Sequence, residues 1–117
     1  MDRTKMELEI SMNNFQDLME AVLPIKIGAP GESFGILGNI VDTAKNLTME
    51  FQNIKGNGLG QIEPEKWDKY EQELHGYINK LLELKELDAG SIFKIKIKMD
   101  RVLQCTAPIR DAGFGSK

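Results

Sequence analysis

Residues 64–87, PEKWDKYEQELHGYINKLLELKEL, carry the most regular hydrophobic pattern of the chain. Large apolar side chains recur there in alternating steps of three and four residues: Trp67, Tyr70, Leu74, Tyr77, Leu81 and Leu84. This spacing places them on one face of an α-helix. Pro64 suits a first helical turn, and Glu65 complements the positive end of the helix dipole. We therefore predict an amphipathic helix, terminated by a left-handed residue at Gly90.

Two further helices are predicted upstream of this one. The first has an apolar stripe formed by Leu8, Met12, Phe15, Met19 and Val22. Pro24 is expected to stop it, because the residue before a proline disfavours α geometry. The second covers residues 34–54, with Ser33 as its N-cap. The glycines and the proline between residues 25 and 33, and the glycines of residues 55–60, are typical of loops.

The segment after Gly90 fits two interpretations. As a helix capped by Ser91, it would place these apolar residues on one face: Ile92, Ile95, Met99, Val102 and Leu103. As a strand, the apolar residues Phe93, Ile95, Ile97 and Met99 alternate with charged ones, three of them lysines, and residues 6–12 show a matching acidic alternation. The two segments could then pair as a ribbon with complementary charges.

We expect helices in both places, because two strands alone make a marginal sheet. The predicted fold is a mainly α, small antiparallel bundle of three to four helices. An α+β fold with residues 6–12 and 92–99 paired as strands is the alternative. Residues 1–105 are expected to form a single helical domain, followed by an extended or mobile tail over residues 106–117.

Composition narrows the function classes. The chain has 117 residues, 41% of them apolar, and a formal net charge of −3. This balance is typical of one globular domain, and the acidic excess makes nucleic acid an unlikely partner class. The sequence has neither a signal-peptide pattern nor an apolar run long enough to span a membrane. We therefore expect no membrane partner. With a single cysteine, Cys105, the sequence has no internal disulfide, which suits a reducing compartment, so we expect a cytoplasmic protein.

A serine-hydrolase pattern occurs once. Residues 31–35, Gly-Glu-Ser-Phe-Gly, match the G-x-S-x-G motif, in which the serine is exposed on a tight strand-to-helix turn. The order of Ser33, acidic residues and His75 also agrees with that family of enzymes. The motif needs a multi-stranded parallel sheet, which the helical periodicity does not predict. A hydrolase using Ser33 is therefore kept only as a third hypothesis, and no catalytic residue is assigned.

No cofactor or metal site is predicted. His75 is the only histidine, and with one cysteine it cannot complete a structural zinc site within the chain. The glycine-rich residues 56–61 match neither the dinucleotide fingerprint nor the P-loop. We therefore expect no cofactor-binding, metal-binding or catalytic residues, and we interpret the chain as a non-enzymatic protein.

The apolar stripes are the best indication of a binding role. Stripes with a strict three-four repeat occur between helices of different chains, and methionine-rich faces adapt to varied partners. The candidate partner-binding residues are Leu8, Met12, Phe15, Met19, Trp67, Tyr70 and Tyr77. A possible basic stripe for phosphates or an acidic partner consists of Lys94, Lys98 and Arg101.

The sequence thus predicts a helical-bundle module for protein–protein interaction or assembly, for example an adaptor, a chaperone or an immunity-type inhibitor. Self-association into an oligomer is one form that this role could take. A helical bundle that encloses a small ligand is the alternative, because the glycine-rich connections and the methionines would permit a cavity.

Overall fold

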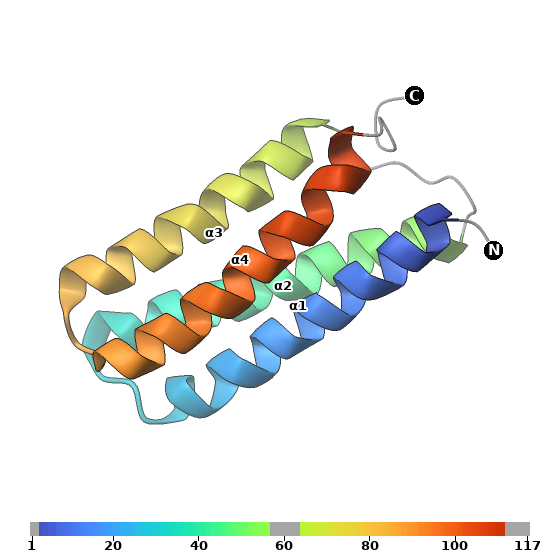
Figure 1. The fold of residues 1–117 in the computed structure, drawn as a ribbon. Helices are drawn as coiled ribbons and strands as arrows, with labels where there is room; N and C mark the ends of the chain where they lie inside the picture. The colour runs from blue at the N-terminus through green and yellow to red at the C-terminus, as the bar shows by residue number, and fades with distance from the viewer. Residues whose placement is uncertain (1–2, 57–63, 112–117) are drawn as a thin grey trace.

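The computed structural model describes residues 3–56 and 64–111, and these residues form four α-helices (Figure 1). The helices are α1 (Arg3–Ile27), α2 (Gly31–Gly56), α3 (Pro64–Leu84) and α4 (Ala89–Asp111). Each helix packs against two others, in the cyclic order α1, α2, α3, α4. The predicted small antiparallel bundle is confirmed.

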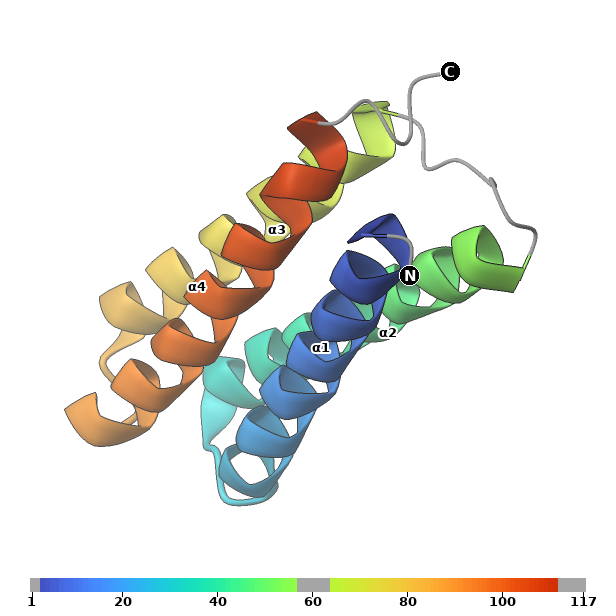
Figure 2. The ribbon, with the colours of Figure 1, turned by 45° about the vertical axis from the view of Figure 1, so that its right-hand side comes forward.

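Two helical hairpins make up the bundle, one formed by α1 and α2 and the other by α3 and α4 (Figure 2). The short turns of both hairpins lie at the same end, where residues 28–30 join α1 to α2 and residues 85–88 join α3 to α4 (Figure 1). The start of α1 and the end of α4 lie at the opposite end. This arrangement follows from the short connections, which make consecutive helices antiparallel neighbours.

The α+β alternative is not supported, because residues 6–12 lie within α1 and residues 92–99 within α4. In α4 the helical spacing, rather than the strand alternation, selects the buried side. Ile92, Ile95 and Met99 are buried, whereas Phe93 and Ile97 are exposed. A helix can therefore bury one complete apolar stripe against its neighbours, which a lone two-stranded ribbon cannot do.

The core is contiguous and receives side chains from all four helices. Its largest fully buried members are Phe15, Leu18, Phe51, Leu37, Ile40, Leu74, Leu81, Ile95 and Met99. Phe15 of α1 and Phe51 of α2 meet edge to face, with ring centroids 5.0 Å apart and planes at 85°. Such aromatic pairs stabilise a core beyond the effect of the area that they bury.

The prediction that Pro24 stops the first helix is wrong. Helix α1 contains Pro24 and continues to Ile27. A proline inside a helix removes one backbone hydrogen bond. The carbonyl group that loses its partner belongs to Glu20, one turn earlier, and Glu20 is exposed, so solvent can hydrate it.

The boundaries of the other helices also differ from the prediction. Helix α2 begins at Gly31, so Ser33 lies in its first turn rather than at its N-cap. Asp88 caps α4 in place of Ser91: the Ser91 backbone N–H donates to Asp88 Oδ2 at 2.9 Å, and Ser91 Oγ donates to Asp88 Oδ1 at 2.7 Å. Asp88 is therefore the side chain that satisfies the free backbone donors at the start of α4.

The left-handed residue after α3 is Lys85, with φ of 57°, and not Gly90. Gly90 lies in the first turn of α4 instead. At the other end of α4, the helix includes residues 106–111, which were predicted to belong to an extended or mobile tail. Residues 112–117 lie outside the described part of the chain.

Candidate functional site

A surface groove lies beside the α3–α4 turn, with a volume of about 360 Å³. Four large apolar residues and two lysines contribute to its lining: Leu82, Leu87, Ile92, Phe93, Lys85 and Lys96. Leu82 is 49% exposed and Phe93 is 58% exposed. Large apolar side chains left this accessible in one place are typical of binding surfaces.

The local backbone sets the shape of this groove. Lys85 adopts a left-handed conformation and ends α3, which reverses the chain direction. The Asp88 cap then starts α4, so Phe93 comes to line the same groove as Leu82. Leu87 lies in the turn between the two helices and packs partly against the core. The groove is thus bordered by the end of α3, which the left-handed Lys85 sets, and by the start of α4, which Asp88 caps.

Both charged residues that line the groove are lysines. Among the residues that the structure describes, neither Lys85 nor Lys96 forms an ion pair. Two carboxylates of the adjoining turn are hydrogen-bonded to helix starts, because Asp88 accepts hydrogen bonds from Ser91 and Glu86 accepts one from the backbone N–H of Ser33 at 2.9 Å. The groove therefore presents two ammonium groups beside an apolar surface.

The same hydrogen bonds shift the pKa values of these carboxylates. The Ser33 backbone N–H is the largest cause that holds the pKa of Glu86 below its ordinary value of 4.5. The Ser91 hydroxyl, followed by the Ser91 backbone N–H, holds the pKa of Asp88 below its ordinary value of 3.8. Both carboxylates therefore stay ionised at neutral pH, at positions where the helix dipole favours negative charge.

Most of the predicted partner-binding residues face the core. Phe15 is fully buried and leaves no surface for a partner, so its assignment as a binding residue is corrected to a core residue. Tyr70 and Tyr77 are half-buried and pack against the core. Burial, together with the charge of Glu50, raises the pKa of Tyr70. The apolar stripe of α3 is therefore explained by contacts with the other helices of the bundle rather than with a partner protein.

The two methionines of the predicted surface lie at a different place in the bundle. Met12 and Met19 are half-buried, and with Leu23 they line a groove of about 390 Å³ between α1 and α2. Polar side chains make up the rest of this lining, among them Gln16 and Gln52. The side chains of Leu8 and Trp67 lie outside the described part of the structure.

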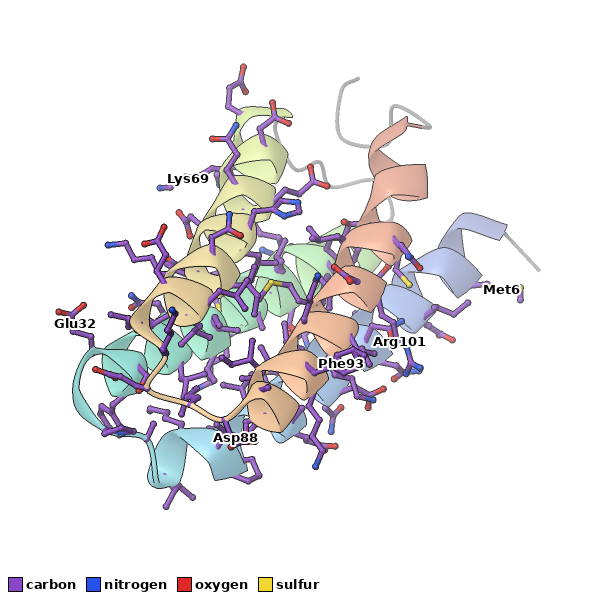
Figure 3. The ribbon with its side chains drawn as sticks, turned by 60° about the vertical axis from the view of Figure 1, so that its left-hand side comes forward. Met6, Glu32, Lys69, Asp88, Phe93 and Arg101 are labelled. Carbon is purple, nitrogen blue, oxygen red and sulfur yellow. The ribbon has the colours of Figure 1, made fainter. Side chains whose placement is uncertain are left out.

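The predicted basic stripe lies on α4. Lys94 and Arg101 are exposed, and Lys98 is half-buried. Phe93 and Arg101 are labelled on this helix in Figure 3. Over residues 89–106 the helix carries four basic side chains and a single acid, Asp100. None of the three stripe residues lines the groove beside the α3–α4 turn, to which this helix contributes Lys96 instead.

Ser33 does not have the surroundings of a hydrolase nucleophile. Its side chain is fully buried, and its hydroxyl donates a hydrogen bond to the backbone carbonyl of Pro30. Ser33 lies in the first turn of α2, which follows the short turn after α1. Residues 3–56 contain no strand. His75 is exposed on α3. The nucleophile elbow requires an exposed hydroxyl at the end of a strand, and Ser33 lacks both features.

A small polar cluster joins α1 to α4. Ser11 Oγ donates to the backbone carbonyl of Cys105 at 3.3 Å, and Asn14 Nδ2 approaches Cys105 Sγ at 3.1 Å. Burial raises the pKa of the Cys105 thiol, and the hydrogen bond from Asn14 partly offsets this effect. The cluster satisfies polar groups at a helix–helix contact, which is a structural role.

Across residues 3–56 and 64–111, no group of three or more His, Cys, Asp or Glu side chains is placed to bind a metal ion. None of the helices in this part of the chain has the length and hydrophobicity needed to cross a membrane.

Comparisons with known proteins found no relative. No protein-family model matches the sequence, and neither the curated proteins nor the solved structures gave a significant match.

Sequence reasoning missed the groove because its residues belong to different parts of the pattern. Leu82 and Leu87 both fall within residues 64–87, which were predicted as one helix. Phe93 was visible only as part of a strand alternation. One signal was available: Phe93 and Ile97 are four residues apart and fall off the stripe of Ile92 and Met99. On a helix that spacing predicts a second apolar strip, which faces solvent.

Proposed function

We propose that this protein is a non-enzymatic helical bundle that binds another protein through the groove between α3 and α4. The observation that carries this proposal is the exposure of Leu82 and Phe93 in the lining of the groove. Ile92, which lines the same groove, is buried and already belongs to the core. The bundle does not need these two side chains to complete its core. Their exposure costs solubility, and a partner that covers them would remove that cost.

The outer face of α4 extends this surface. Ile97, one turn after Phe93, is 38% exposed, so the two side chains form an exposed apolar pair four residues apart. Arg101 follows one further turn along. Aromatic residues and arginine are enriched among the residues that contribute most to protein–protein binding.

Quantitative affinity capture from cells of the source organism tests the proposal. The bait proteins are the wild type, the Leu82→Ser/Phe93→Ser double variant and a Met49→Ser control. Met49 is 61% exposed on α2, away from the groove lining. We expect at least one protein to be captured by the wild type and the control and to be lost with the double variant. Equal capture by all three baits, combined with a monomer in light scattering, would contradict the proposal.

A small apolar ligand is the second candidate, favoured by the groove volume of about 360 Å³, which lies within the range of ligand sites. A thermal-shift screen across nucleotides and lipids distinguishes the two. A compound that stabilises the wild type by more than about 1 kcal/mol of linked free energy, but not the double variant, would support the ligand instead of a protein.

A further inference from the structure

The groove beside the α3–α4 turn combines an apolar lining with positive charge, and this combination specifies the chemistry of its partner. Leu82, Leu87, Ile92 and Phe93 supply the apolar surface, and Lys85 and Lys96 supply two ammonium groups. The groove lining contains no acidic residue. An occupant that matches it must bring an apolar side chain together with negative charge.

The two carboxylates of the α3–α4 turn form no ion pair with the lysines of the groove. Glu86 is bound to the first turn of α2, and Asp88 is bound to the first turn of α4. Each carboxylate thus compensates the positive end of a helix dipole rather than a lysine. Neither Lys85 nor Lys96 has an acidic partner among the described residues. Their charge remains available for a partner.

The charge distribution along α4 extends the same preference. The chain as a whole has a formal net charge of −3. Residues 89–106 nevertheless contain Lys94, Lys96, Lys98 and Arg101 against the single acid Asp100. A basic helix on an acidic protein concentrates the attraction for an acidic partner on one side of the bundle.

The helix ends that border the segments outside the described residues lie far from the groove. Helix α4 runs away from it, and Asp111 lies about 27 Å from Phe93 at a rise of 1.5 Å per residue. The start of α1 and the ends of α2 and α3 that flank residues 57–63 also lie at the far end of the bundle (Figure 1).

We propose that the groove binds a short segment of a partner protein in which a large apolar side chain is flanked by Asp or Glu. The apolar side chain lies against Leu82 and Phe93, and the flanking carboxylates pair with Lys85 and Lys96. This inference rests on the proposed protein-binding function and adds the chemical class of the partner. A volume of about 360 Å³ holds one or two large side chains, so the segment can be short.

Selection from a phage library of random 12-residue peptides tests the inference without a known partner. The wild-type protein is the target, and peptides that also bind the Leu82→Ser/Phe93→Ser variant are removed. Both replaced side chains are about half exposed, so this variant is expected to fold, and circular dichroism checks that it does. We expect enriched peptides that combine Leu, Phe or Trp with adjacent Asp or Glu. No enrichment, or enrichment of peptides without acidic residues, would overturn the inference.

Fluorescence anisotropy of an enriched peptide then measures the role of each part of the groove. Phe93→Ser should weaken binding about tenfold or more, as expected for a central aromatic contact. Lys85→Gln/Lys96→Gln should weaken it about threefold to tenfold, and added salt should reduce this difference. The matched control is Lys45→Gln/Lys69→Gln. Lys69 lies near the start of α3, at the opposite end of the bundle from Asp88 (Figure 3), and the control should bind like the wild type.

The outcomes separate this inference from the proposed function. Binding of a partner could be lost with Phe93→Ser and yet be unaffected by the lysine variant and by salt. That result would support the protein-binding function and overturn the inference that the partner segment is acidic. Light scattering that shows a dimer disrupted by Phe93→Ser would also overturn it, because a second copy would then cover the groove. If no protein or peptide binds, both proposals fail.

Discussion

The carboxylate of Glu86, in the turn after α3, accepts a hydrogen bond from the backbone N–H of Ser33, in the first turn of α2, at 2.9 Å. The two residues are 53 positions apart in the sequence. A helix start needs acceptors for its free N–H groups, and here the second hairpin supplies one to the first. The contact therefore fixes the two hairpins against each other at the end of the bundle where the groove lies.

Replacing Glu86 tests this contact. Glu86→Ala should lower the midpoint of thermal unfolding, because the Ser33 N–H loses its acceptor and the start of α2 loses a complementary charge. Glu83→Ala, at an exposed position on α3, is the matched control and should leave the midpoint nearly unchanged. Equal effects of the two substitutions would show that the Glu86–Ser33 contact does not stabilise the fold.

The same contact predicts how stability depends on pH. The pKa of Glu86 is lower in the folded protein than its ordinary value of 4.5, so the unfolded chain binds a proton first as the pH falls. The stability that the carboxylate contributes is fully present above about pH 4.5 and is lost as the pH falls through the folded-state value. Urea unfolding of the wild type and Glu86→Gln should therefore converge in stability at low pH. A difference that is constant from pH 7 to pH 3 would contradict the prediction.

Gly31 and Gly35 provide a second test at the start of α2. Gly31 has a φ of 51°, and a Cβ placed there would lie 2.8 Å from Glu86 Oε1. A Cβ at Gly35 would meet nothing within 4 Å. Gly31→Ala should therefore destabilise the protein by about 1–2 kcal/mol, the cost of the left-handed conformation, with crowding of Glu86 adding to it. Gly35→Ala should stabilise it by about 1 kcal/mol, because alanine favours a helix interior. Urea unfolding measures both, and effects of the same sign would contradict the assigned conformations.

Replacement of Phe15 distinguishes a core residue from a binding residue. Phe15 is fully buried against Phe51, so Phe15→Ala should cost about 3–5 kcal/mol of unfolding free energy. Denaturant unfolding measures this free energy. Phe93→Ala is the control: its side chain is 58% exposed, so its replacement should lower the unfolding free energy much less. A stable Phe15→Ala protein that has lost its partner would instead restore Phe15 as a binding residue.

Cys105 should react slowly with thiol reagents. Burial raises the pKa of its thiol above the ordinary value of 9.0, so little reactive thiolate forms at pH 8. Its Sγ also lies beside Asn14 Nδ2 at the α1–α4 contact. The rate of reaction with a disulfide reagent at pH 8 should rise clearly when urea unfolds the chain. The same rate in the native and the unfolded protein would contradict the packing of α1 on α4.

Helix positions were predictable from the sequence, and helix ends were not. The three-four repeat of α3 depends on local periodicity, so it identified the helix correctly. The start of α2 depends on Glu86, which is distant in the sequence, and local propensity therefore suggested Ser33 as its cap. Pro24 shows the same limit at the end of a helix, because α1 continues past it. Packing of α1 against its neighbours outweighs the local preference of proline to end a helix.

The groove escaped prediction because its existence depends on the register of two helices. The sequence shows that Leu82 and Phe93 are apolar, but only the packed bundle decides that both remain exposed and line one groove. Conversely, the stripe of α1 with Phe15 and the stripe of α3 with Tyr70 and Tyr77 were interpreted as binding surfaces, and these three side chains pack in or against the core. Periodicity locates an apolar face without identifying what covers it.

Amide hydrogen exchange of the protein, alone and saturated with the captured partner or a selected peptide, tests the central claim most directly. Binding at the groove should slow exchange over residues 82–97, which contain the end of α3, the turn and the start of α4. Exchange in α1 and α2 should change little. Slowed exchange confined to α1 and α2, with residues 82–97 unaffected, would contradict the assignment of the groove as the binding site.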